Sequence, residues 1–137
     1  FELFFQPLVN LKSGRISTCE ALLRWNHPVR GTVSPTDIIP VAEDMGLIVD
    51  VGGWVLREAC FECLRWPAGI RVSVNLSPIQ FRRDTVLSAV REALAVTGLP
   101  PSRLEVEITE SVLLYDVEAT RKVLTELRET GPRGLAE

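Results

Sequence analysis

Alternating apolar and polar positions predict four β-strands along the chain. In residues 70–76, Val72 and Val74 face one way while Ser73 and Asn75 face the other, which is the two-residue period of a half-buried strand. Strands of this kind are predicted at residues 3–9, 16–25, 70–76 and 104–109. Apolar residues that recur every three or four positions predict helices at residues 36–45, 51–65, 85–97 and from Ser111 or Asp116 to Gly131.

The order of these elements indicates the fold class. The first two strands are joined by a short turn at Gly14 and are expected to pair antiparallel. From residue 34 onward strands alternate with helices, which is typical of a parallel sheet covered by helices. Four strands with their helices amount to about half of an eight-stranded barrel of ~250 residues. We therefore expect an α/β fold that contains the first half of a barrel, and residues 133–137 are too few to assign.

Length, charge and composition indicate which ligands the protein could bind and where in the cell it is expected. The chain has 137 residues, enough for one domain with its own core, and a formal net charge of −3. This charge argues against binding of a DNA or RNA polymer through bulk positive charge, so an anionic ligand would be held by single arginines or a metal. No apolar run is long enough to cross a bilayer, and no signal peptide is visible. The odd number of cysteines, three, argues against the disulfide framework of a secreted protein. These features predict a cytoplasmic location.

Three polar residues on the predicted strands are candidates for a metal site. Glu20 lies in the middle of a strand that is otherwise apolar on both faces, and a buried charge must be paired or bound to a metal. Asn75 and Glu107 lie near the C-terminal ends of two later strands, where barrels carry their catalytic groups. Two carboxylates and an amide are hard oxygen donors that suit Mg²⁺, Mn²⁺ or Ca²⁺.

The same residues could instead have purely structural roles, and the sequence does not decide between these roles and a metal site. The carboxylates could pair with arginines, and Asn75 could cap the turn that follows it. Glu105 shares the face of Glu107 but lies deeper, so an ion pair is favoured for it. Arg24 is about 13 Å along the strand from Glu20, too far for a close ion pair but near enough to hold a phosphate at a metal. The candidate arginines are Arg24, Arg71 and Arg103.

Two further motifs are interpreted as structural. Cys60 and Cys63 form a CxxC pattern on a predicted helix, but no second pair completes the four ligands of a zinc site, so burial is expected. His27 is the only histidine and lies in a predicted loop before Pro28. Nothing near it resembles a nucleophile elbow, so a position at the surface or a role in shaping the loop is expected.

Several motifs in order resemble those of EAL domains, bacterial phosphodiesterases that hydrolyse cyclic di-GMP. The signature is the Glu-Ala-Leu of residues 20–22, followed by Arg24-Trp25. The other matching blocks lie at residues 5–7, 24–28, 34–35 with 39–43, 74–78 and 105–111. Because these blocks follow the family's order across residues 2–131, the chain is identified as a member of the family.

The resemblance implies a TIM-like (β/α) barrel whose first strand runs antiparallel, with only about the first half present. It implies Mg²⁺ or Mn²⁺ at Glu20, Asn75 and Glu107, with Glu20 counted as catalytic. The implied reaction is attack of a metal-bound water on one phosphodiester of cyclic di-GMP, which gives the linear dinucleotide pGpG.

Further roles follow from the resemblance alone. Gln6 and Arg24 match positions that contact the dinucleotide, and Arg24 would lie at a phosphate. Glu110 matches a glutamate that steadies a metal-site loop and supports a homodimer. Such domains often follow sensory or GGDEF-type cyclase modules, so a membrane anchor elsewhere in the parent protein is compatible with a cytoplasmic domain.

The chain departs from the family pattern at its end. Family members continue into a strand that carries Asp-Asp-Phe-Gly and supplies further metal ligands, and later strands supply a lysine, a glutamate and a glutamine. We therefore expect residues 1–137 to be a single, partial EAL domain truncated before that strand, and to be inactive alone. The alternative is a non-catalytic EAL module that acts as a cyclic di-GMP receptor or as an interaction and dimerisation element.

Overall fold

The computed structural model describes residues 2–29, 31–33, 40, 42, 44, 46–76, 86–108, 125 and 133–136. The strands are β1 (Glu2–Val9), β2 (Ile16–His27), β3 (Gly31–Val33), β4 (Arg71–Leu76), β5 (Leu104–Ile108) and β6 (Arg133–Ala136). The helices are α2 (Ile48–Cys63) and α4 (Val86–Thr97), and a 3₁₀ turn spans Pro101–Arg103.

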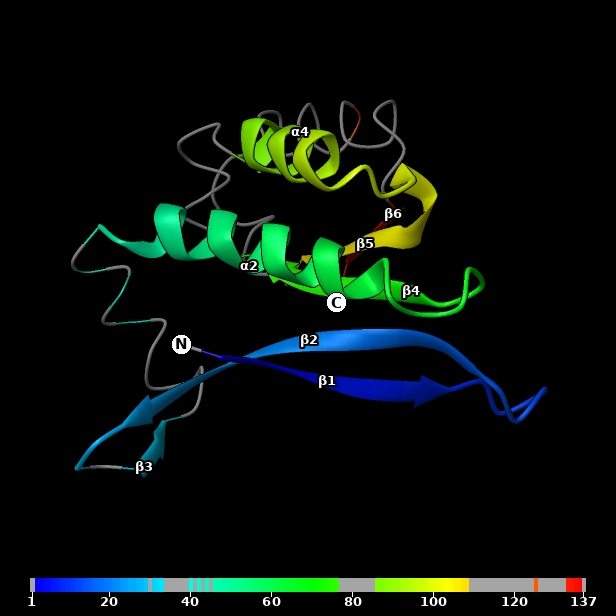
Figure 1. The fold of residues 1–137 in the computed structure, drawn as a ribbon, viewed down its shortest axis with the longest axis horizontal. Coiled ribbons are helices and arrows are strands. Elements are labelled where there is room, and N and C mark those ends of the chain that lie inside the picture. Colours follow the sequence, from blue (N-terminus) through cyan, green and yellow to red (C-terminus); the bar gives the residue numbers. More distant parts are fainter. Residues whose placement is uncertain are drawn as a thin grey trace.

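The strands form one six-stranded sheet with helices on one side (Figure 1). Its order is β1-β2-β4-β5-β6, and β3 pairs with the far end of β2. β1 runs antiparallel to β2, whereas β2, β4, β5 and β6 form a parallel series. The expected antiparallel first strand and the crossovers through α2 and α4 are thereby confirmed.

Alternation along the strands divides the sheet into an apolar and a polar face. The apolar face packs against α2 and α4, whose Leu56 and Val90 are fully buried. This burial supplies the main stabilising term, at about 25 cal/mol per Å² of apolar surface removed from water. The strand residues that contribute to this core are Ala21, Leu23, Val72, Val74, Leu104 and Val106.

The turn between β1 and β2 is stabilised by residues that favour turns in the sequence, Asn10 and Gly14. The Asn10 side chain accepts hydrogen bonds from the backbone N–H groups of Lys12 and Ser13, at 2.9 and 3.3 Å. Gly14 has φ +69°, a left-handed conformation that glycine adopts without the steric cost of a Cβ. The turn joins the two strands, and a register shift between Leu8 and Val9 then sets the pairing that places Gln6 opposite Glu20.

The structure corrects the predicted elements in three places. The predicted loop after residue 25 instead continues β2 to His27 and returns as β3, with Gly31 at φ +72°. Residues 133–136 form β6, although four residues carry too little pattern to assign. Helix α2 begins at Ile48 rather than at residue 51, with Leu47 at its N-cap position and Asp50 in its first turn, where a carboxylate complements the positive end of the helix dipole.

Some predictions fall outside the described residues. Glu110 lies there, as do most of the helix expected at 36–45 and, apart from Thr125, the helix expected from Ser111 or Asp116 onward. The helix expected at 85–97 is confirmed as α4. Within the described part of the chain, no helix has the length and apolarity needed to cross a membrane.

Cys60 and Cys63 are both fully buried in the core, as expected for a structural CxxC pattern. Burial raises the pKa of Cys60 from 9.0 to about 12, and the adjacent Cys63 adds to the rise. Burial also raises the pKa of Cys63, although Arg103 opposes the change. In the folded state Cys60 therefore stays protonated well above the pH at which a free thiol ionises, and the shift of the Cys63 pKa is in the same direction.

We expect Cys60 to resist thiol reagents in the folded protein. A pKa higher by about three units lowers the thiolate fraction at pH 8 by roughly 10³-fold, so labelling by a disulfide reagent should slow at least that much. The raised pKa also means that this group's contribution to stability is complete below pH 9 and is lost as the pH rises toward 12. Labelling rates of a variant that keeps only Cys60, folded and in denaturant, test the prediction. Equal rates would contradict it.

Candidate metal centre

The polar face of the sheet carries the candidate ligands. On β2, Glu20 lies on the opposite face from the core residue Ala21, and strand alternation places Asn75 of β4 and Glu107 of β5 on the same side. In register, Glu20 faces Gln6 of β1 and Ser73 of β4, while Asn75 faces Glu107 directly. The three residues named from the sequence therefore occupy adjacent strands of one face.

Hydrogen bonds connect these residues across the strands. The Asn75 amide Nδ2 donates to Oε1 of Glu20 at 3.0 Å. The Ser73 hydroxyl donates to Oε1 of Glu107 at 2.9 Å, and both of these side chains are buried. Glu20 is half-buried and Asn75 is exposed, so the face is closed near Ser73 and opens toward the C-terminal ends of the strands.

Within the described segments, the alternative of an arginine ion pair holds for Glu105 and not for Glu20. Arg71 lies with its Nε 3.0 Å from Oε1 of Glu105, which confirms the ion pair favoured for that residue. This Nε–H makes no hydrogen bond, so the contact is Coulombic. Among the described residues no arginine forms an ion pair with Glu20, whose carboxylate instead accepts the amide of Asn75. A charge in such a position is one that a cation would complement.

The residues expected to contact a dinucleotide lie at the edge of this face. Gln6 is exposed and faces Glu20 across the β1–β2 pair. Arg24 is half-buried, faces Glu2 in register, and its Nη1 donates to the carbonyl of Leu23 at 2.9 Å. The structure thus brings Gln6 beside Glu20, while Arg24 lies further along β2.

The donor set fits a hard divalent cation. Two carboxylates and an amide provide oxygen ligands of the kind that Mg²⁺ and Mn²⁺ prefer. Within the described ranges no three His, Cys, Asp or Glu side chains gather as a metal site, and this set holds only two such residues. The amide of Asn75 donates through Nδ2 to Glu20, and its Oδ1, which is an acceptor only, is the atom that could ligate a metal.

Ser73 is the residue of this centre that sequence patterns do not identify. Alternation puts it on the face of Asn75, but this indicates only a polar strand position. Its hydrogen bond to Glu107 depends on how far β4 and β5 are staggered. The available signal is a small hydroxyl residue two positions before Asn75 on the same face.

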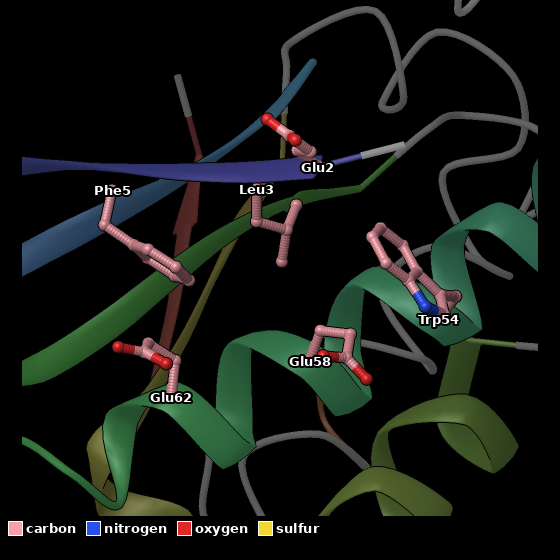
Figure 2. A pocket seen from close by; sticks show the side chains of 6 residues that line it. All are labelled: Glu2, Leu3, Phe5, Trp54, Glu58 and Glu62. Carbon is pink, nitrogen blue, oxygen red and sulfur yellow. The ribbon is translucent and has the colours of Figure 1, made fainter. Parts of the chain in front are cut away.

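A cavity of about 340 Å³ lies elsewhere, between β1 and α2 (Figure 2). Leu3 and Phe5 point from the strand toward the helix, and Phe5 meets Trp66 edge-on with ring centroids 5.1 Å apart. Since these residues belong to the core side of the sheet, the cavity is separate from the candidate metal centre. Its lining residues are Glu2, Leu3, Phe5, Trp54, Glu58 and Glu62.

Comparison with known families identifies the class of protein. A family model described as the EAL domain matches residues 1–133, so the chain belongs to the EAL domain family. The solved structure of the PaMucR phosphodiesterase in complex with c-di-GMP superposes with a TM-score of 0.91 and 39% identity. This match covers 97% of the chain and 56% of that structure, and the TIM-like fold of a partial domain is thereby confirmed.

Two curated relatives show how far the likeness extends. The chain is 52% identical over 130 residues to protein y4lL of Sinorhizobium fredii, which covers 95% of the chain and 16% of that protein. It is 41% identical over 133 residues to the bifunctional diguanylate cyclase/cyclic di-GMP phosphodiesterase MucR of Pseudomonas aeruginosa, which covers 94% and 19% respectively. The chain therefore spans less than a fifth of these relatives, one of which combines two activities.

Proposed function

We propose that the protein containing this chain is a metal-dependent phosphodiesterase that hydrolyses cyclic di-GMP to pGpG. The observation that carries the proposal is the placement of Glu20, Asn75 and Glu107 on adjacent strands of one face, in a chain that belongs to the EAL family. MucR, which is similar to this chain, is named as a cyclic di-GMP phosphodiesterase. This supports the same substrate here.

The three residues would hold Mg²⁺ or Mn²⁺ through oxygen atoms. When bound, the metal supplies Lewis-acid activation of a phosphate oxygen and of the water that attacks it. Glu20 and Glu107 would balance the charge of the cation, and Asn75, which lies between them in the strand order, would add a neutral ligand. The buried side of the face, near Ser73 and Glu105, limits the approach of water from the N-terminal ends of the strands.

Binding of the dinucleotide would involve the edge strand β1 and its neighbour β2. Gln6 lies beside Glu20 in register and can offer both a donor and an acceptor to a guanine or a ribose. Arg24 would bind a phosphate once its guanidinium leaves the carbonyl of Leu23. We further propose that Glu110 steadies a metal-site loop and contributes to a homodimer.

Residues 1–137 are proposed to be part of one EAL domain rather than a complete catalytic unit. The chain covers 56% of the solved MucR phosphodiesterase chain, so roughly half of such a barrel lies outside it. Hydrolysis is therefore expected from the full-length protein and not from this chain alone.

Removal of the metal is expected to abolish turnover. The full-length protein should convert cyclic di-GMP to pGpG with Mn²⁺ or Mg²⁺, and excess EDTA should lower the rate at least ~10³-fold, because a Lewis acid supplies several kcal/mol of transition-state stabilisation. Added Mn²⁺ should restore the rate. Chromatographic detection of pGpG provides the measurement. Tight binding of cyclic di-GMP without any product would instead favour the receptor alternative, and turnover unaffected by EDTA would contradict the metal.

A further inference from the structure

Ser73 is a buried hydroxyl among the carboxylates of the polar face. Its side chain is fully buried, and its register neighbours are Glu20 on β2 and Glu105 on β5. Its hydroxyl donates to neither of these but to Oε1 of Glu107, diagonally across β4 and β5, at 2.9 Å. A serine hydroxyl has only one proton to donate, so Ser73 can donate a hydrogen bond to only one of the three nearby carboxylates, and in the structure this is Glu107.

The hydrogen bond constrains a torsion that is otherwise loosely defined. The last torsion of a glutamate side chain is broad and roughly twofold, so packing alone orients its carboxylate poorly. A donor to Oε1 of Glu107 restricts the orientation of the carboxylate, and the backbone that carries this donor is held because Ser73 lies within β4, a central strand. Partners that orient a ligand in this way typically change metal affinity about 10–100-fold when removed.

We propose that Ser73 is a positioning residue that holds the carboxylate of Glu107 in the orientation needed to ligate the divalent metal. The inference rests on the proposed function, because the orientation of Glu107 matters for turnover only if a metal binds there. Ser73 acts through Glu107 and does not touch the substrate. Its loss would also remove one hydrogen bond from a buried carboxylate.

The test compares variants of the full-length protein. Ser73→Ala removes the donor, Ser73→Thr keeps a hydroxyl, and Thr18→Val is the matched control, since Thr18 is also buried, at 5% exposure, on the face of Glu20. Mn²⁺ affinity is measured by electron paramagnetic resonance of the free ion, without substrate. The rate of hydrolysis is then followed as a function of Mn²⁺ concentration, and thermal unfolding reports on the fold.

We expect Ser73→Ala to weaken Mn²⁺ binding by about tenfold and to raise the Mn²⁺ concentration for half-maximal rate by the same factor. At saturating Mn²⁺ its kcat should change less, and Ser73→Thr should recover most of the affinity. Thr18→Val should bind Mn²⁺ as the wild type does. If Ser73→Ala does not fold, Ser73→Cys replaces it, because a thiol is a similar size and only a weak donor.

Two results would overturn the role of Ser73. One is wild-type Mn²⁺ affinity in Ser73→Ala, and the other is an equal loss in Ser73→Ala and Thr18→Val, which would indicate a general packing defect. Variants Glu20→Gln and Asn75→Ala separate this failure from failure of the proposed function. If they lose Mn²⁺ while Ser73→Ala keeps it, only the positioning role is wrong. If the wild type binds no Mn²⁺, or these variants bind it unchanged, the metal site itself is wrong.

Discussion

Replacing Glu20 by glutamine is expected to lower the hydrolysis of cyclic di-GMP by the full-length protein at least ~10³-fold, equivalent to the several kcal/mol that a bound metal supplies. Glutamine keeps the length of the side chain and a carbonyl oxygen that can accept the hydrogen bond from Asn75. The substitution therefore removes the charge but preserves the contact, so the fold should be retained. The measurement is kcat/KM with Mn²⁺, together with the unfolding temperature.

Glu58→Gln provides a control of the same chemistry. Glu58 is an exposed glutamate on α2, and it lines the cavity on the core side of the sheet rather than the polar face. Its substitution should leave kcat/KM within about twofold and change stability by less than ~0.5 kcal/mol. If Glu20→Gln also retained turnover within a few-fold of the wild type, Glu20 would not be a metal ligand and the proposed reaction would be wrong.

Strand alternation is enough to predict which residues share the polar face. The two-residue period places Asn75 and Glu107 on the face opposite to Val74 and Val106, and the structure confirms this, because both valines belong to the core cluster and Asn75 pairs with Glu107. The antiparallel pairing of the first two strands follows from the short turn that contains Gly14. These features depend on residues close in sequence, and this is why the sequence alone indicates them.

The register between strands and the presence of very short strands cannot be predicted from local sequence patterns. The bond between Ser73 and Glu107 depends on the stagger of β4 against β5, which non-local packing decides. Strands β3 and β6, of three and four residues, are too short to show a period and exist because they pair with β2 and β5. Gln6 and Arg24 keep their proposed roles, while Glu110 lies outside the described residues.

Arg103 has a role that sequence patterns do not reveal, because its acceptors are backbone carbonyls. Its Nη2 donates to the carbonyls of Cys63, Pro67 and Ile70 at 2.9, 3.0 and 2.9 Å, and its Nε donates to Ile70 at 3.1 Å. The guanidinium therefore satisfies carbonyls at the end of α2 and in the loop before β4. The sequence alone suggests Arg103 only as a partner for carboxylates.

Arg103→Ala is expected to lower the free energy of unfolding by about 2–3 kcal/mol. Each hydrogen bond to a charged donor contributes roughly 1.5–3 kcal/mol, and the partial exposure of Arg103 lets water replace some of them. Arg103→Lys should recover less than half of the loss, because an ammonium lacks the planar fork that reaches several carbonyls at once. Urea unfolding followed by tryptophan fluorescence measures both effects. Arg91→Ala, an exposed position on α4, is the control and should change stability by less than ~0.5 kcal/mol.

The same substitution connects stability to the candidate metal centre. Arg103 directly precedes β5 and binds the loop that leads into β4, so it fixes the N-terminal ends of these two strands against each other. The stagger that it supports is the one that pairs Asn75 with Glu107. Arg103→Ala should therefore also weaken Mn²⁺ binding by the folded full-length protein, by about threefold, while Arg91→Ala should not. A stable Arg103→Ala variant, within about 0.5 kcal/mol of the wild type, would show that the loop carbonyls are satisfied equally well by water.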